Sequence, residues 1–243
     1  MSRQGVFWLL IGFISLGMIF LDLGKGAWLV WGFVVISILF YFSINPHLGF
    51  FIQSITRTIP GNVLLTFDDG PDPERTPAIL EILRKHEAKA MFFLIGRKIE
   101  GQEKLIQDMA KEGHMIGSHS QNHLPWMGFM GRSQVEQELG QAHSILQKVV
   151  PYAGNWFRPP FGVTNPILAK ASRKLGLQSV AWTVRSFDTA RHNPENLVKT
   201  LLSQIKGSDI VLLHDTQQVT VDALEALILG LKKKNYTLKA QLK

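Results

Sequence analysis

Hydrophobic positions near the N-terminus form two uninterrupted runs. Val6–Leu21 and Ala27–Ser43 contain no charged residue, and a short polar connection with Asp22 and Lys25 separates them. Each run has about 16–17 residues, which at ~1.5 Å per residue is short but adequate for a helix that crosses a bilayer. We therefore predict a transmembrane helical hairpin over residues 1–44. A single re-entrant or peripheral hydrophobic arm is the alternative. A cleaved signal peptide is disfavoured because no small-residue cleavage site precedes the second run.

A linker over residues 45–59 leads to a second region, 60–243, with a different pattern. Short apolar runs alternate there with longer segments of helical period, and such alternation predicts a parallel sheet. The expected fold is α/β: a distorted, incomplete β/α barrel of about seven parallel strands, with a doubly wound open sheet as the alternative. The runs that predict strands are Asn62–Phe67, Lys89–Leu94, Met115–Ser118, Trp156–Arg158, Ser179–Trp182, Asp209–Leu213 and Tyr236–Lys239.

Composition narrows the chemistry available to this region. The 243 residues include no cysteine, so disulfides and thiolate metal sites are excluded and a metal would need His and carboxylate ligands. The formal net charge is +7, which indicates a basic surface or, alternatively, attraction to anionic lipid headgroups or glycans. The sequence has no nucleic-acid motif and no basic run longer than Lys232–Lys234, so we expect no nucleic-acid partner.

Polar residues that suit catalysis follow the predicted strands. In a barrel of parallel strands, active sites assemble at the carboxyl ends of the strands. Polar residues scattered over a surface would not respect that rule, so these positions favour a catalytic function. They are Asp68, Asp69, His119, Arg158, Asp188 and His214.

Two histidines and a carboxylate are candidate metal ligands. His119 and His123 are four residues apart, a spacing that places two imidazoles on one face of a helical turn. Asp69 could complete a two-His, one-carboxylate set with open positions for water and substrate, which suits zinc or another divalent first-row metal. Asp68 would then be free to act as a general base. An aspartate pair that only caps a loop is the alternative.

Two later segments could supply the remaining catalytic groups. Two prolines stiffen the loop 158–162, so a backbone N–H of Phe161 or Gly162 could face a developing oxyanion. His214 ends a buried predicted strand and suits a general acid. A histidine at a strand end is, however, more often structural than catalytic.

Four motifs join these residues into one pattern: TFDDGPD at 66–72, HSQNH at 119–123, RPPFG at 158–162 and LLH at 212–214. In order and spacing they resemble the polysaccharide deacetylase family, the NodB-homology domain of carbohydrate esterase family 4, over roughly residues 60–243. The resemblance implies a distorted β/α barrel and one divalent metal ion, most commonly zinc. The ligands it implies are Asp69, His119 and His123.

The same resemblance implies the catalytic roles. Asp68 resembles the general base and His214 the general acid. Arg158 would orient and tune the base, and Asp188 would hold Arg158. Leu212 would line the acetyl pocket. The residues expected to contact substrate are Pro159, Phe161, Arg185 and Leu212.

One region departs from the family pattern. The family usually has an Asp-x-x-Asp-Trp run after the fifth strand. Here Arg185 replaces the first Asp and Thr189 replaces the Trp, while Asp188 is retained. Phe161 stands where Tyr is common, which keeps the backbone donor and loses a hydroxyl. These changes alter a wall of the substrate pocket and leave the reaction type unchanged.

Three hypotheses for function follow. The first is a metal-dependent hydrolase that removes N-acetyl groups from peptidoglycan or another N-acetylglucosamine polymer. The second keeps the reaction but takes a lipid-linked amino sugar, because the chain carries a predicted membrane anchor and because Arg185 could meet a phosphate. The third is an inactive carbohydrate-binding or scaffold protein. Membrane lipid is an expected partner, and nothing in the sequence indicates a protein partner.

The expected location is the cell membrane, as a two-helix multi-pass protein. Lys and Arg near helix ends favour the cytoplasmic side. Arg3 and Arg57 flank the hairpin, whereas its connection has only Lys25 beside Asp22. This count places the catalytic domain on the cytoplasmic side by one or two charges, although an assembled wall polymer would lie on the other side.

Overall fold

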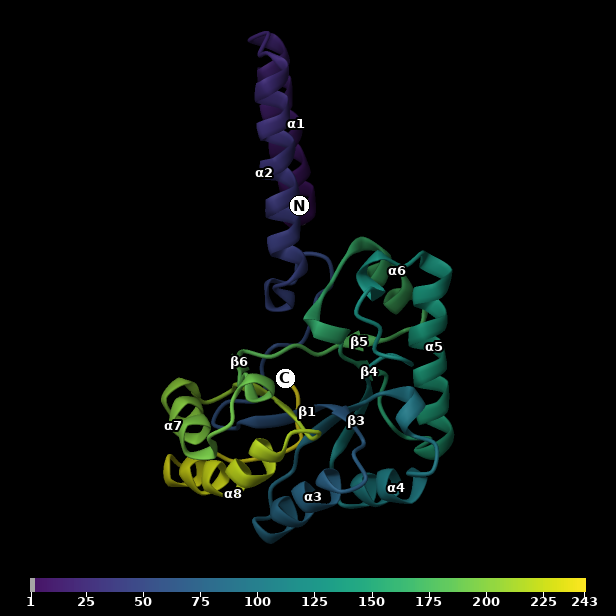
Figure 1. Cartoon of the computed structure of the whole chain (residues 1–243), viewed down its shortest axis with the longest axis vertical. Helices are drawn as coiled ribbons and strands as arrows, with labels where there is room; N and C mark the ends of the chain where they lie inside the picture. The colour runs from purple at the N-terminus through teal and green to yellow at the C-terminus, as the bar shows by residue number, and fades with distance from the viewer. Residues whose placement is uncertain (1–2) are drawn as a thin grey trace.

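The computed structural model describes residues 3–243 and places two long helices before an α/β domain. Helices α1 (Arg3–Phe20) and α2 (Lys25–Ser43) run antiparallel and project from the domain as a hairpin (Figure 1). Both are long and apolar enough to cross a membrane. None of the side chains of α2 is buried, so the hairpin presents its apolar residues outward.

The open end of the hairpin is tied to the domain by specific contacts. The Arg3 guanidinium donates a hydrogen bond to the Leu48 carbonyl at 2.7 Å. The Ser43 hydroxyl donates to the Thr164 carbonyl at 2.7 Å, and the Thr164 N–H donates back to the Ser43 carbonyl at 2.8 Å. The Phe42 ring stacks on Phe50 with centroids 4.1 Å apart. The start of α1 and the end of α2 therefore lie at the same end of the hairpin, next to the domain.

Seven parallel strands form a single sheet in the order β5-β4-β3-β2-β1-β7-β6. A flat sheet of this size would hold its edge strands about 29 Å apart, six spacings of ~4.8 Å. The edge strands β5 and β6 are joined by residues 180–183 alone, which span at most roughly 18 Å. The sheet must therefore curl into the incomplete barrel that the sequence predicted. The strands are β1 (Leu64–Gly70), β2 (Met91–Leu94), β3 (Met115–Ser118), β4 (Trp156–Phe157), β5 (Gln178–Ser179), β6 (Val184–Arg185) and β7 (Ile210–His214).

One of these strands differs from the predicted set. Tyr236–Lys239, predicted as the seventh strand, contributes only an isolated bridge between Thr237 and Asn62. The remaining strand of the seven-stranded sheet is instead β6, which pairs with β7. A strand of two residues is too short to produce a periodic signal in the sequence.

Six helices surround the curved sheet (Figure 1). The side chains of β1 alternate between two sides. Leu65 and Phe67 join the large core against the helices, whereas Leu64 belongs to a smaller cluster inside the barrel. Thr66 and Asp68 share the parity of Leu64, so they face the interior. The helices are α3 (Arg75–Lys85), α4 (Glu103–Lys111), α5 (Arg132–Val149), α6 (Pro166–Lys174), α7 (Pro194–Gln204) and α8 (Gln218–Lys233).

Candidate active site

Three predicted metal ligands meet at the carboxyl ends of β1 and β3. The Oδ1 atom of Asp69 lies 3.5 Å from Nε2 of His119 and 3.3 Å from Nε2 of His123. All three ligand atoms lie within 4.8 Å of one another. Asp69 Oδ1 is buried and has no hydrogen-bond partner. A cation bound between this oxygen and the two imidazoles would supply the missing partner. The residues therefore fit a divalent metal.

The two histidines reach this point by a different backbone from the predicted helical turn. Residues 119–123 form an irregular loop after β3, and Ser120 and His123 have left-handed φ values of 63° and 53°. Nδ1 of His119 lies 2.8 Å from the Arg158 carbonyl, which makes Nδ1 the protonated nitrogen and leaves Nε2 for a metal. Burial lowers the pKa of His119 to about 3, so its imidazole is neutral at pH 7.

Asp68 lies beside the ligands but has a different environment. The Arg158 guanidinium donates to Asp68 Oδ1 at 2.7 Å, and both side chains are almost fully buried. Burial raises the pKa of Asp68 above its usual value, although the charges of Arg158 and His214 act against that rise. Asp68 is therefore an ionisable group with a raised proton affinity and a fixed position, as a general base requires.

Asp188 does not hold Arg158, and that prediction was wrong. Arg158 is saturated inside the barrel by Asp68, the Thr66 hydroxyl and the carbonyls of Val180 and Ala181. Asp188 lies in a short 3-10 helix, Asp188–Ala190, beside the end of β7. Packing thus places it against a different partner.

That partner is His214. Nδ1 of His214 lies 2.7 Å from Asp188 Oδ1, and the His214 N–H donates to Asp188 Oδ2 at 2.7 Å. Burial acts to lower the pKa of His214, but the hydrogen bond and the negative charge of Asp188 outweigh it and raise that pKa above its usual value. The carboxylate thus favours a protonated imidazole, which suits a general acid.

Known proteins with similar sequences fall into one family. The family model for polysaccharide deacetylase matches residues 56–180. A peptidoglycan-N-acetylglucosamine deacetylase from Bacillus cereus is 35% identical over 190 residues, which are 75% of this chain and 88% of that protein. The chain belongs to the polysaccharide deacetylase family.

Similar proteins in this family include both a second deacetylase and an inactive relative. A chitooligosaccharide deacetylase from Sinorhizobium fredii is 32% identical over 168 residues, 68% of this chain and 78% of that protein. A pseudoenzyme of the same esterase family from Bacillus anthracis superposes with a TM-score of 0.70 at 29% identity, covering 76% of this chain and 66% of that one. Active and inactive deacetylase-family proteins thus share the fold, and the individual residues of the site carry the distinction.

Several residues of the four sequence motifs line a cavity of about 260 Å³ at the mouth of the barrel. Arg158, Asp188 and Pro159 lie outside its lining, and the first two contact the lining residues Asp68 and His214 from behind. Pro159, a predicted substrate contact, is buried and stays a prediction. The lining residues are Asp68, Asp69, His119, His123, Phe161, Gly162, Trp182, Arg185, Thr189, Leu212 and His214.

Trp182 is a lining residue that the motifs did not single out. A Cβ atom on Gly162 would lie 2.3 Å from the Trp182 ring, and Gly162 has φ 69°, so only glycine fits here. The Gly162 N–H donates to the Pro159 carbonyl at 2.9 Å. Of the two predicted oxyanion donors, the N–H of Phe161 is therefore the remaining candidate.

Proposed function

We propose that this chain is a metal-dependent N-deacetylase that removes acetyl groups from amino sugars of the cell envelope. The observation that carries the proposal is the separation of three roles around one cavity. Asp69, His119 and His123 converge as metal ligands, Asp68 is held by Arg158, and His214 is held by Asp188. An inactive carbohydrate-binding protein would have no need for a buried carboxylate paired with an arginine beside a half-buried histidine paired with a second carboxylate.

The residues divide the hydrolysis of the amide among them. A bound divalent metal, with zinc best suited to this ligand set, would supply Lewis acidity to the water and the acyl carbonyl. Asp68 accepts the proton of the attacking water, and its raised pKa gives it the affinity to do so. The N–H of Phe161 stabilises the developing oxyanion. His214 then donates a proton to the departing amine, which otherwise leaves poorly.

The walls of the cavity suggest which acyl group and sugar it accepts. Leu212 is buried at the cavity and provides an apolar surface for the acetyl methyl group. Arg185 lies on the same wall in register with Leu212 and is exposed, so it can bind an anionic group on the substrate. Thr189 is smaller than the tryptophan usual in the family and leaves room beside it.

The hairpin of α1 and α2 anchors the enzyme in the cell membrane in this proposal. Its exposed apolar side chains and its contacts to the domain would keep the cavity close to the bilayer. The substrate is therefore an N-acetylated glycan or precursor that is present at the membrane.

The test uses the purified full-length chain in detergent. We expect about one bound divalent metal per chain, release of free amine from N-acetylated amino sugars, and loss of this activity with a chelator that added metal reverses. His192→Ala, which changes an exposed histidine outside the site, should retain both metal and activity. If the folded, metal-loaded chain releases no amine from glycans or from their lipid-linked precursors, the protein is an inactive carbohydrate-binding or scaffold protein instead.

A further inference from the structure

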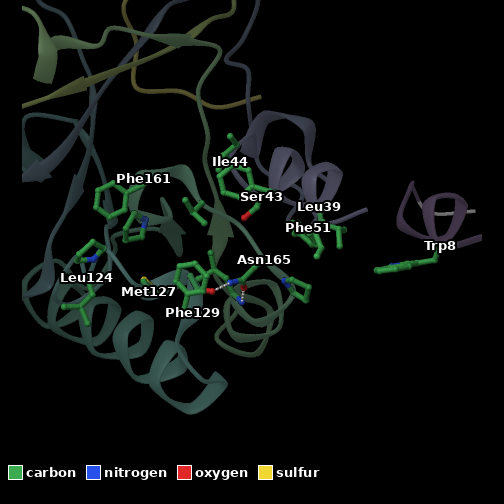
Figure 2. Close-up of a pocket in the computed structure, with 18 residues that line it drawn as sticks. Trp8, Leu39, Ser43, Ile44, Phe51, Leu124, Met127, Phe129, Phe161 and Asn165 are labelled. Carbon is green, nitrogen blue, oxygen red and sulfur yellow. Dashed lines mark hydrogen bonds between the residues drawn. The ribbon is translucent and has the colours of Figure 1, made fainter. Parts of the chain in front are cut away.

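A second and larger cavity, of about 450 Å³, lies between the hairpin and the catalytic domain (Figure 2). Trp8 of α1 and Leu39 of α2 face it from the hairpin, and Phe51 faces it from the linker. The domain contributes residues from the loop after His123 and from the segment after Arg158. We call this cavity the hairpin groove, and its domain side consists of Leu124, Pro125, Met127, Gly128, Phe129, Pro160, Phe161, Val163, Asn165, Pro166 and Leu168.

The lining of the hairpin groove is suited to hydrocarbon. Apart from the indole of Trp8, the polar side chains that line it are Ser43 and Asn165, and these two are already paired. The Ser43 hydroxyl donates to the Thr164 carbonyl at 2.7 Å. The Asn165 amide donates to the Gly128 carbonyl at 2.7 Å and accepts from the Leu168 N–H at 2.7 Å. A sugar or a peptide in this groove would lose its hydrogen bonds to water without replacement, whereas an aliphatic chain would lose none.

One end of the hairpin groove meets the catalytic cavity. Phe161 lines both cavities, and its ring lies 4.6 Å from the ring of His123, a metal ligand. Leu124 in the groove directly follows His123 in the chain. Phe161 is thus a wall common to the groove and the catalytic cavity, and the two cavities adjoin at this residue.

The other end of the groove is continuous with the part of the chain proposed to lie in the bilayer. Leu39 and Phe40 come from the last turns of α2, a helix with no buried residue. Phe129, on the domain rim, is 93% exposed, and a large apolar side chain so exposed in water is better accommodated by lipid. The groove thus has a lipid-facing end and a catalytic end.

We infer that the substrate is an amino sugar attached to a membrane lipid, whose hydrocarbon chain occupies the hairpin groove while the N-acyl group reaches Asp68 and His214. This inference rests on the proposed deacetylase function and names the substrate class for it. A water-soluble polymer would leave the groove without an occupant. A lipid-linked sugar uses both cavities and needs to leave the bilayer only by its headgroup.

The experiment compares two substrates on the full-length chain in phospholipid nanodiscs. Both carry N-acetylglucosamine on a phosphate, one with a long isoprenoid chain and one with a butyl group. Leu39→Trp fills the groove from α2, and Gly128→Leu fills it from the domain, where a Cβ atom meets only Val163 at 3.5 Å. Leu29→Trp is the matched control, because Leu29 lies on the same helix, 77% exposed and outside the groove.

The long-chain substrate should have the higher kcat/KM on the unmodified protein, since each buried methylene changes a binding constant by roughly fourfold. Leu39→Trp and Gly128→Leu should each lower that kcat/KM at least about tenfold and leave the butyl substrate unchanged. Membrane partition of the long chain acts equally on Leu29→Trp, which should match the unmodified protein.

Two results would overturn the inference and are distinguishable from each other. If both substrates are deacetylated and neither groove variant affects the long-chain one selectively, the groove holds a bystander lipid and the deacetylase function stands. If neither these substrates nor soluble glycan oligomers are deacetylated by metal-loaded protein, the proposed function fails and the inference with it.

Discussion

Asp68 and Asp69 are neighbours in sequence but belong to different parts of the site. Asp68 faces the barrel interior and meets Arg158. Asp69 has a left-handed φ of 74°, at a point where the register between β1 and β2 shifts, and this turns its carboxylate toward the two histidines. A local backbone irregularity thus turns two identical side chains to different partners, as the proposed roles of base and ligand require.

Substituting each aspartate alone tests that separation. Asp68→Asn should lower turnover by roughly 10²–10⁴-fold, because a proton acceptor is lost, and should leave bound metal unchanged. Asp69→Asn should weaken metal affinity by at least roughly 100-fold, since a ligand is worth more than its supporting hydrogen bonds. Metal titration monitored by calorimetry, together with amine release, measures both. Equal metal affinities in the two variants would contradict the assignment.

The pairing of His214 with Asp188 predicts a pH effect. His214 acts as an acid only while protonated, so its raised pKa extends the alkaline limb of kcat/KM above the usual range of histidine. Asp188→Asn removes the negative charge that stabilises the imidazolium, so the pKa of His214 falls and the alkaline limb moves to lower pH. A pH–rate profile checks this. Ser203→Ala, at an exposed position of α7, serves as the control. An alkaline limb that does not move in Asp188→Asn would rule out the pairing as the source of the effect.

At the residue scale, the sequence predicted the types of group but not all of their partners. The metal ligands could be recognised because carboxylate and imidazole at strand ends have few other uses. The partner of Asp188 could not, since only long-range packing brings His214 to Asp188 and keeps Arg158 on Asp68. Burial of Arg158 among carbonyls from residues 180 and 181 decided the choice, and no local pattern encodes that.

At the element scale, the end of β1 sets the position of Asp69. Gly70 follows Asp69, and a Cβ atom there would lie 2.1 Å from Asp215 Oδ2, a buried carboxylate that accepts a 2.6 Å hydrogen bond from Thr76. The strand end is therefore packed directly against Asp215, which follows β7 and is bonded to the start of α3. Only a residue without a side chain allows this approach.

Gly70→Ala should therefore destabilise the protein by about 1–3 kcal/mol through overpacking, and it should reduce metal affinity because Asp69 moves with the strand. Thermal or denaturant unfolding measures the first effect and metal titration the second. Gly140→Ala is the control. Gly140 lies within α5, where alanine favours the helix, and the added Cβ atom would lie at an ordinary 3.7 Å from the Leu175 side chain. A Gly70→Ala variant as stable as the control would show that the strand end adapts to a side chain.

The sequence located most of the strands by their apolar runs. Strand β3 coincides with its predicted run, and β1 and β7 overlap theirs over residues 64–67 and 210–213. The runs Trp156–Arg158 and Ser179–Trp182 overlap the two-residue strands β4 and β5. No run predicted β6, also of two residues, because its place in the sheet depends on closure of the barrel rather than on its own composition.

At the scale of the whole molecule, the hairpin and the catalytic domain were predictable as parts but their junction was not. The hairpin groove combines residues from α1, α2, the linker and two loops of the domain, and the Ser43–Thr164 hydrogen bonds join positions 121 residues apart. No window of the sequence contains such a surface. The structure thus adds a relation between anchor and site that composition alone leaves open.

The side of the membrane on which the catalytic domain lies is the last prediction. Arg3 contacts Leu48, so the N-terminal end of α1 and the domain share one side if both helices span. That side carries Arg3 and Arg57, whereas the connection carries Lys25 beside Asp22, and positive charge favours the cytoplasm. We therefore expect a cytoplasmic domain, where lipid-linked precursors are present and an assembled wall polymer is not. Fusions at Lys243 measure this: a fluorescent reporter that folds in the cytoplasm should be active, and a phosphatase that folds only outside should not. Asp22→Lys with Leu23→Lys reverses the charge balance and should exchange the two signals. An active phosphatase on the unmodified chain would place the domain outside and favour a finished glycan as substrate.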